Sequence, residues 1–76
     1  MNKLELKSIM ARHDESVTDL AKVINKTPQT VYNKMNEYEV NGKKQEFTQG
    51  EIRKIADHYN MTAEQIKAVF FEEKVS

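Results

Sequence analysis

Apolar side chains recur along the chain at spacings of three and four residues, which places them on one face of an α-helix. Five stretches follow this pattern, with inward positions at Leu6, Ile9, Met10 and His13, at Val17, Leu20, Ala21 and Ile24, at Val31 and Met35, at Ile52, Ile55, Ala56 and Tyr59, and at Ile66, Val69 and Phe70. The pattern predicts an all-α domain of five helices, the first spanning residues 3–13. We expect His13 to be partly packed rather than to bind a ligand.

The second and third helices are expected to be short and joined by a tight turn. Ser16 can cap the second helix, and Asp19 favours the positive end of its dipole. Asn25 tolerates the left-handed backbone that ends a helix. Thr27 and Pro28 then start the third helix, because threonine caps well and proline suits the first helical position. This layout is typical of a helix-turn-helix.

Two capping boxes frame the last two helices. Thr48 followed by Glu51 predicts a reciprocal pair of side-chain to backbone hydrogen bonds at a helix start. Thr62 followed by Gln65 repeats the signal. The Asn60–Met61 pair separates the two helices.

Residues 37–47 centre on Asn41–Gly42, a strong hairpin signal. A two-residue turn there would set three pairs of residues opposite one another, namely Val40 with Lys43, Glu39 with Lys44, and Tyr38 with Gln45. The same pairing places Tyr38, Val40 and Phe47 on one face, from which they are able to lie on the helical core.

As a functional element, such a hairpin would act as a wing beside the third helix. Lys43 and Lys44 would then reach a phosphate backbone or the minor groove. The alternative is an extended loop that contacts no DNA, which the marginal stability of an isolated two-stranded ribbon favours.

The third helix presents amides outside its inward stripe. The residues on this outer face are Gln29, Tyr32, Asn33 and Asn36. Amide side chains can offer a donor and an acceptor side by side, which matches adenine in the major groove, and an aromatic ring can contact thymine methyl groups. The alternative is an ordinary solvated face. Together with the preceding helix and turn, this face favours binding of double-stranded DNA.

Residues 16–36 resemble the helix-turn-helix of the Cro and phage-repressor (Xre) family. Leu20–Ala21 is similar to the Leu-Ala pair of that family's first motif helix, and Ile24 to its closing apolar residue. Thr30–Val31 is similar to the Thr-Val or Ser-Ile pair of its recognition helix. The resemblance implies a compact five-helix Cro-like fold that reads DNA.

The resemblance extends beyond the motif. Phe47–Thr48–Gln49, Glu51–Ile52 and Phe70–Phe71 resemble a group of small uncharacterised phage proteins of this type. By position, the implied base contacts are Pro28, Gln29, Tyr32 and Asn33. The implied phosphate contacts are Thr27, Thr30, Lys34 and Asn36. The chain departs from the family at Val17 and Asn25, where Gln and Gly are common.

Twelve basic and twelve acidic residues cancel, whereas nucleic-acid modules usually carry a positive excess. The lysines in or near the motif and the following loop are Lys22, Lys26, Lys34, Lys43 and Lys44, and acids gather toward the C-terminal end at Glu64, Glu72 and Glu73. Lys26, Lys43 and Lys44 join the expected phosphate contacts, because these contacts need only a positive local field. The alternative, that the charges are solubilising pairs, implies weak or salt-sensitive binding.

Other classes of function have little support in the sequence. The chain has no cysteine, so we expect no disulfide or thiolate metal site and a reducing cytoplasm as its setting. No apolar run approaches the roughly 20 residues of a membrane span, so we expect no membrane contact. His13 and His58 lack neighbouring ligands, and we expect no metal, no cofactor and no enzymatic activity. The length predicts a single helix-turn-helix domain over residues 1–76.

These observations lead to one hypothesis and one alternative. The hypothesis is a sequence-specific DNA-binding transcriptional regulator, a phage or prophage repressor that occupies promoter DNA. Two copies should bind half-sites about one helical turn apart, because one module buries little surface. Phe71 is the candidate dimer contact, near Phe70 and Val75, unless both phenylalanines fill the core. The alternative is a protein-interaction module, antirepressor or antitoxin-like, which zero net charge favours.

Overall fold

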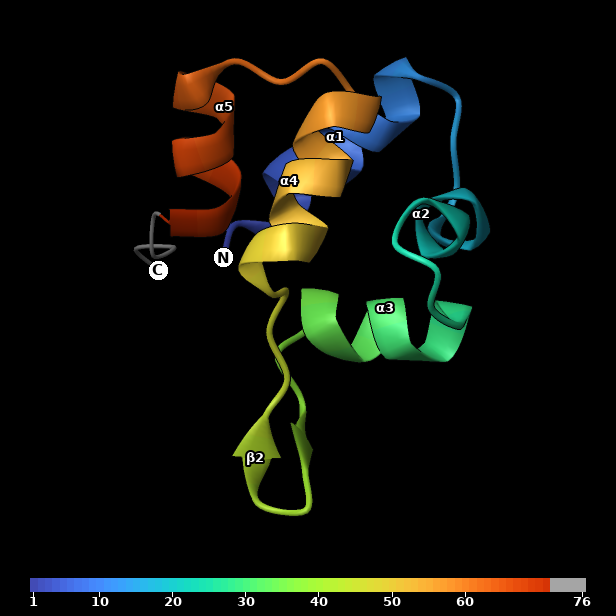
Figure 1. Ribbon diagram of the computed structural model, residues 1–76, viewed down its shortest axis with the longest axis vertical. Helices are drawn as coiled ribbons and strands as arrows, with labels where there is room; N and C mark the ends of the chain where they lie inside the picture. The colour runs from blue at the N-terminus through green and yellow to red at the C-terminus, as the bar shows by residue number, and fades with distance from the viewer. Residues whose placement is uncertain (72–76) are drawn as a thin grey trace.

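Five α-helices and one β-hairpin form residues 1–71, the part of the chain that the computed structural model describes (Figure 1). In chain order the elements are α1 (Lys3–Arg12), α2 (Val17–Val23), α3 (Pro28–Met35), β1 (Glu39–Val40), β2 (Lys43–Lys44), α4 (Gln49–His58), α5 (Ala63–Ile66) and the π-helical turn η1 (Lys67–Phe71) that continues α5. The predicted five helices are confirmed. None of the helices within this range has both the length and the apolar character needed to cross a membrane. Glu72, Glu73 and Val75 lie outside the described residues.

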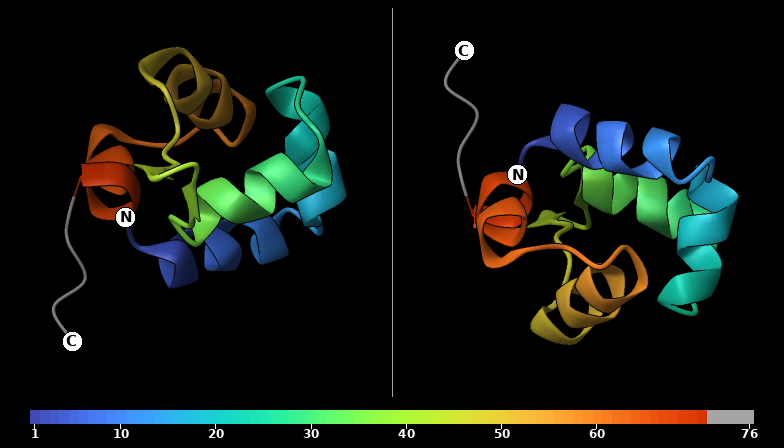
Figure 2. Two further views of the ribbon diagram at one scale, coloured as in Figure 1. Left: turned by 90° about the horizontal axis from the view of Figure 1, so that it is seen from below. Right: turned by 90° about the horizontal axis from the view of Figure 1, so that it is seen from above.

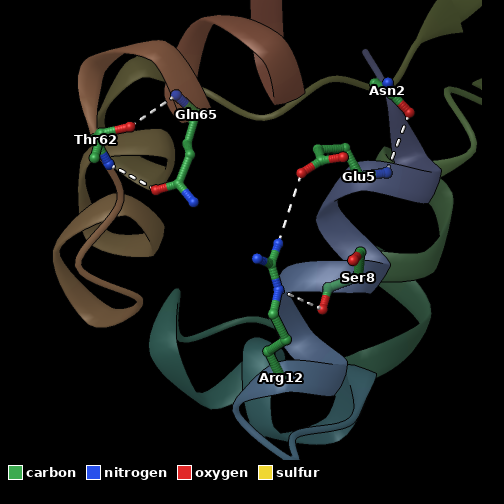
Figure 3. Close-up of polar contacts among 6 residues, drawn as sticks. All are labelled: Asn2, Glu5, Ser8, Arg12, Thr62 and Gln65. Carbon is green, nitrogen blue, oxygen red and sulfur yellow. Dashed lines mark hydrogen bonds and ion pairs between the residues drawn. The ribbon is translucent and has the colours of Figure 1, made fainter.

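Short polar side chains start three helices as their positions predict. Thr27 Oγ1 accepts a hydrogen bond at 3.2 Å from the backbone N–H three residues later, at the start of α3. Thr48 Oγ1 accepts from the Glu51 N–H, and the Glu51 carboxylate accepts from the Thr48 N–H at 2.9 Å. The same reciprocal pair joins Thr62 and Gln65 at the start of α5 (Figure 3).

The first helix has a cap that its apolar pattern does not reveal. The Asn2 side chain accepts a hydrogen bond from the Glu5 N–H at 3.1 Å (Figure 3). The Arg12 guanidinium lies 3.7 Å from the Glu5 carboxylate, and both side chains are exposed. Exposed ion pairs of this kind contribute about 0–1 kcal/mol, so the buried stripe is the main support of α1.

Four helix ends use residues in the left-handed conformation. These residues are Asp14, Asn25, Glu37 and Asn60, with φ between 50° and 57°. After Asn25, the Lys26 N–H reaches back to the Ala21 carbonyl at 2.9 Å, which is the long bond of a Schellman motif. The predicted end of the second helix at Asn25 is confirmed, and α2 turns directly into α3.

The helices surround one apolar core. Figure 2 shows α1 and α4 on opposite sides of it and α2 and α5 on the other two, and Figure 1 shows α3 across one end. The largest fully buried side chains are Leu6, Leu20, Ile24, Val31, Ile55 and Val69, so each predicted stripe contributes at least one. His13 is exposed, and its ring lies 5.0 Å from that of Tyr59. It therefore covers the edge of the core rather than filling it.

The segment between α3 and α4 forms the β-hairpin. It does not form the extended loop, which the marginal stability of an isolated two-stranded ribbon had favoured. The observed pairs are those predicted, namely Glu39 with Lys44, Val40 with Lys43, and Tyr38 with Gln45. Asn41 and Gly42 have φ of 54° and 76°, and a type I′ turn requires a positive φ at both positions. The Asn41–Gly42 turn therefore accounts for the formation of the hairpin.

Of the three residues on the face that was able to lie on the helical core, only Phe47 does so. Tyr38 and Val40 are 49% and 42% exposed. The hairpin extends away from the helices, beyond α3 (Figure 1). The left-handed backbone at Glu37 redirects the chain directly after α3, and Phe47, where the chain returns toward α4, is buried in the core.

Candidate nucleic-acid interface

The orientation of α3 is set by its buried side chains. Val31 and Met35 are 0% and 2% exposed and belong to the core. On the opposite face Gln29 and Tyr32 are exposed and Asn33 is half-buried. The predicted inward stripe is confirmed, and the predicted outward face holds for Gln29, Tyr32 and Asn33, whereas Asn36 is half-buried and bonded to α1.

Two amides on the outward face are bonded to each other. Gln29 Nε2 donates to Asn33 Oδ1 at 2.9 Å, across one helical turn. This bond leaves the Gln29 side-chain oxygen as an acceptor and an N–H of the Asn33 amide as a donor. A donor and an acceptor held side by side match the N6 and N7 atoms of adenine, and ordering them in advance lowers the entropic cost of binding.

The hairpin adds a second group of side chains next to α3. Residues that face one another across an antiparallel pair project to the same side, and successive residues alternate. One side of the hairpin therefore carries Tyr38, Val40 and Lys43, and the other carries Glu39. At the base of the hairpin this side meets α3, because the ring centroid of Tyr38 lies 6.1 Å from that of Tyr32. Both elements together form the α3–hairpin surface, which consists of Gln29, Tyr32, Asn33, Tyr38, Val40 and Lys43.

The two hairpin lysines are not equivalent. Lys44 shares its side with Glu39, and its Nζ lies 3.4 Å from Glu37 Oε2. Lys43 is exposed on the side that carries Tyr38. Of the two predicted phosphate contacts, Lys43 therefore belongs to the α3–hairpin surface and Lys44 lies behind it.

Lys34 does not fit the predicted phosphate contact. It is 8% exposed, and its Nζ lies 2.6 Å from Glu51 Oε1. Because its ammonium is buried against a carboxylate, Lys34 is not available to contact a phosphate. The pair instead fastens α3 to the start of α4.

Glu51 serves both its own helix and this ion pair. Burial alone raises the pKa of its carboxyl, but the hydrogen bonds from Lys34 and from the Thr48 backbone, with the Lys34 charge, outweigh burial and hold that pKa below its ordinary value. The same Oε1 atom accepts from both donors. A capping box predicted from local spacing thus also holds α3 in place.

Asn36 likewise has a structural role instead of the predicted phosphate contact. Its Oδ1 accepts from Lys3 Nζ at 2.6 Å, and its Nδ2 donates to the Tyr32 carbonyl at 2.9 Å. Both ends of the amide are used to close α3 and to tie it to α1. Asn36 is therefore also not available to contact a phosphate.

The other predicted contacts lie around the start of α3. Lys26, Thr27 and Pro28 are exposed, and Thr30 is half-buried. The Thr27 and Thr30 hydroxyls are 2.9 Å apart and share a hydrogen bond. This end of α3 carries the positive end of the helix dipole, where an anion is favoured.

Phe71 is the last residue of η1, which continues α5. It is 64% exposed, whereas Phe70 packs on the core and meets Phe47 edge to face at 5.9 Å. The alternative in which both phenylalanines fill the core is therefore wrong. Phe71 is an exposed aromatic side chain on a different element from the α3–hairpin surface.

One known family matches the part of the chain that contains the α3–hairpin surface. Residues 6–71 match the model of the family described as Domain of unknown function (DUF5053). The chain belongs to this family. The match runs from α1 to η1, so the DUF5053 domain includes both elements of the α3–hairpin surface. No curated protein and no solved structure matches the chain.

Two other polar sites occur on this DUF5053 domain. His58 Nε2 lies 2.9 Å and 3.0 Å from the two Glu15 carboxylate oxygens, and burial next to Glu15 raises the pKa of Tyr59. An open groove is lined by Glu5, Thr62, Glu64, Gln65, Lys67 and Ala68. The Thr62 hydroxyl oxygen and the Gln65 side-chain oxygen there accept the hydrogen bonds of the capping box. Within residues 1–71, no group of three or more histidine or acidic side chains is placed to hold a metal ion.

Proposed function

We propose that the protein is a sequence-specific DNA-binding transcriptional regulator that acts by occupying promoter DNA, as a phage or prophage repressor does. The observation that carries this proposal is the α3–hairpin surface, in which α3 and the hairpin present a bonded amide pair, two neighbouring tyrosines and an exposed lysine. In this proposal α2 and α3 would correspond to the helix-turn-helix of the Cro and phage-repressor (Xre) family, which residues 16–36 resemble.

In this proposal α3 enters the major groove, which admits an α-helix. Gln29 and Asn33 would bond to an adenine, and Pro28 would approach the neighbouring bases at the start of the helix. The hairpin would lie against the adjoining backbone, with Lys43 at a phosphate that borders the major groove. The remaining phosphate contacts would come from Lys26, Thr27 and Thr30. Lys44 would contribute less, because it lies on the other side of the hairpin and pairs with Glu37.

The number of exposed lysines sets the expected salt dependence. Lys26, Lys43 and Lys44 are exposed, whereas Lys34 is paired in the interior. Each phosphate contact contributes about −0.9 to the slope of log K against log salt, so one copy should show a slope of about −2 to −3. This is modest, in keeping with the zero net charge of the chain.

Specific recognition would require two copies. A single small module buries too little surface for high specificity, so two half-sites about one helical turn apart are expected. Phe71 is the proposed self-complementary contact, because it is exposed on η1 and leaves α3 and the hairpin available to DNA.

A protein-interaction module of the antirepressor or antitoxin type is the second candidate. It is favoured by zero net charge and by three exposed apolar or aromatic side chains, Tyr32, Tyr38 and Val40. In that case the same surface would bind a protein, and DNA affinity would be independent of the α3 amides.

Selection from a random duplex-DNA library, at low and at near-physiological salt, tests the proposal. A two-fold symmetric consensus that survives the higher salt is expected. Retention at low salt alone, without a consensus, would leave phosphate attraction and support the protein-interaction candidate.

Variants of the amide pair then test the assignment of residues. Gln29→Ala and Asn33→Ala should each relax the preferred base at one position, with a loss of about 1–3 kcal/mol per bidentate contact. Lys67→Ala, in η1 on another part of the surface, is the control. Unchanged affinity and base preference in both amide variants would refute the readout by α3.

A further inference from the structure

The α3–hairpin surface contains an apolar strip between its polar groups. Tyr32, Tyr38 and Val40 are 46%, 49% and 42% exposed. The two tyrosine rings lie 6.1 Å apart and are tilted by 55°, and Val40 projects to the same side of the hairpin as Tyr38. Exposed apolar side chains that gather on one surface often mark a binding site.

The strip lies directly beside the amide pair. Tyr32 follows Gln29 by three residues and precedes Asn33 by one, so all three share the outward face of α3. A protein group that binds the N6 and N7 atoms of an adenine lies next to a thymine, either in the same base pair or in a neighbouring one. In the major groove that thymine presents one apolar group, its 5-methyl.

We infer that Tyr32, Tyr38 and Val40 form a binding site for the 5-methyl groups of pyrimidines in the major groove. This inference rests on the proposed function, and it names the chemical group that the hairpin adds to readout by α3. Thymine is the expected source of the methyl group, because the adjacent amides match adenine. 5-Methylcytosine carries the same group and is the second source.

Duplexes that contain deoxyuridine in place of thymidine test the inference, because they lose the methyl group and keep every hydrogen bond. At each contacted position we expect affinity to fall about fourfold, the change that corresponds to about 0.8 kcal/mol for a buried CH₂ group. In a second series, 5-methylcytosine replaces cytosine. Loss with deoxyuridine identifies thymine as the source, and a gain confined to 5-methylcytosine identifies methylated cytosine.

Variants connect the effect to the strip. Tyr38→Ser should remove most of the difference between thymidine and deoxyuridine duplexes, whereas Tyr38→Phe, which keeps the ring, should preserve it. Lys44→Ala, on the other side of the hairpin, should weaken both duplexes equally. Because Tyr38 is half exposed, these changes leave the core intact, and circular dichroism and thermal unfolding confirm the fold.

The two proposals fail in different ways. Equal affinity for methylated and unmethylated duplexes, in a parent protein that binds a consensus, overturns the methyl site and leaves DNA readout standing. A difference that survives Tyr32→Ser combined with Tyr38→Ser also overturns it. Absence of binding to any duplex overturns the proposed function and the methyl site together.

Discussion

At the scale of single residues, the two hairpin lysines should differ in their contribution to DNA binding. Lys43 lies on the same side of the hairpin as Tyr38, and Lys44 lies on the opposite side and pairs with Glu37. Lys43→Ala should therefore weaken DNA binding about three- to tenfold and lower the salt slope by about one, as expected for one lost phosphate contact. Lys44→Ala should change both quantities less. Fluorescence anisotropy over a salt series measures them, and equal effects would show that the hairpin does not present one side to DNA.

Because the Glu51 carboxylate is ionised in the folded protein, the free energy of unfolding should fall at acidic pH. Its pKa is lower in the folded protein than its ordinary value of 4.5. Such a group stabilises the fold above the unfolded pKa, and this stabilisation is lost as pH falls through the folded pKa. Asp19, whose pKa is lowered by hydrogen bonds from the Ser16 backbone and hydroxyl, acts in the same direction.

Glu51→Gln should therefore lower the free energy of unfolding at neutral pH and flatten its decline below about pH 4.5. The loss at neutral pH should be on the order of 3 kcal/mol, because the buried Lys34 ammonium is left without its carboxylate. Urea unfolding across this pH range is the measurement. Glu39→Gln, an exposed hairpin residue, is the control and should keep the parent profile. An unchanged profile for Glu51→Gln would contradict the role of this pair.

At the scale of elements, the hairpin and the helical core should respond separately to mutation. Gly42 has φ of 76°, and a Cβ atom built there meets nothing within 4 Å. Gly42→Val should therefore act through the backbone, at about 1–2 kcal/mol for a side chain in the left-handed region. We expect DNA affinity to fall about five- to thirtyfold while the thermal midpoint of the core changes little.

Gly50 provides a matched control for Gly42. It also has open space around its Cβ position, but it lies in the first turn of α4 with no positive φ. Gly50→Ala should stabilise the fold by about 0.4–1 kcal/mol and leave DNA binding unchanged. Hydrogen exchange of the Gln45 N–H, which is bonded to the Tyr38 carbonyl, reports on the hairpin. A loss of core stability in Gly42→Val that matches the loss of affinity would contradict separate elements.

Elements were predictable where their signals are local. Thr27, Thr48 and Thr62 cap the helices they were expected to cap, and Asn41–Gly42 forms the expected turn. Each of these signals lies within four residues of its partner, so spacing along the chain is sufficient to detect it.

Contacts between distant elements were not predictable in the same way. Lys34 and Glu51 are separated by 17 positions, and nothing in the spacing of either indicates the other. The one available signal was that Lys34 lies between the inward Val31 and Met35. The direction of the hairpin depends on the left-handed backbone at Glu37. A glutamate does not predict this conformation, because a positive φ is uncommon for this residue type.

At the scale of the whole molecule, assembly is proposed to use a different part of the surface from DNA binding. Phe71→Glu places a charge where an exposed ring would pack against a second copy, so it should shift sedimentation toward the monomer and abolish preference for paired half-sites. Leu4, which is 58% exposed on α1, provides the control variant Leu4→Glu, which should sediment like the parent. An unchanged assembly state in Phe71→Glu would remove this residue from the interface.

The most direct test of the account is a nuclear magnetic resonance titration of the isotope-labelled protein with duplex DNA carrying the selected consensus. We predict that the largest amide shifts cluster on residues 26–33 of the turn and α3 and on residues 38–45 of the hairpin, while the outer side of α5 is little changed. Shifts centred on the groove between α1 and α5, or no shifts at all, would contradict DNA recognition by the α3–hairpin surface.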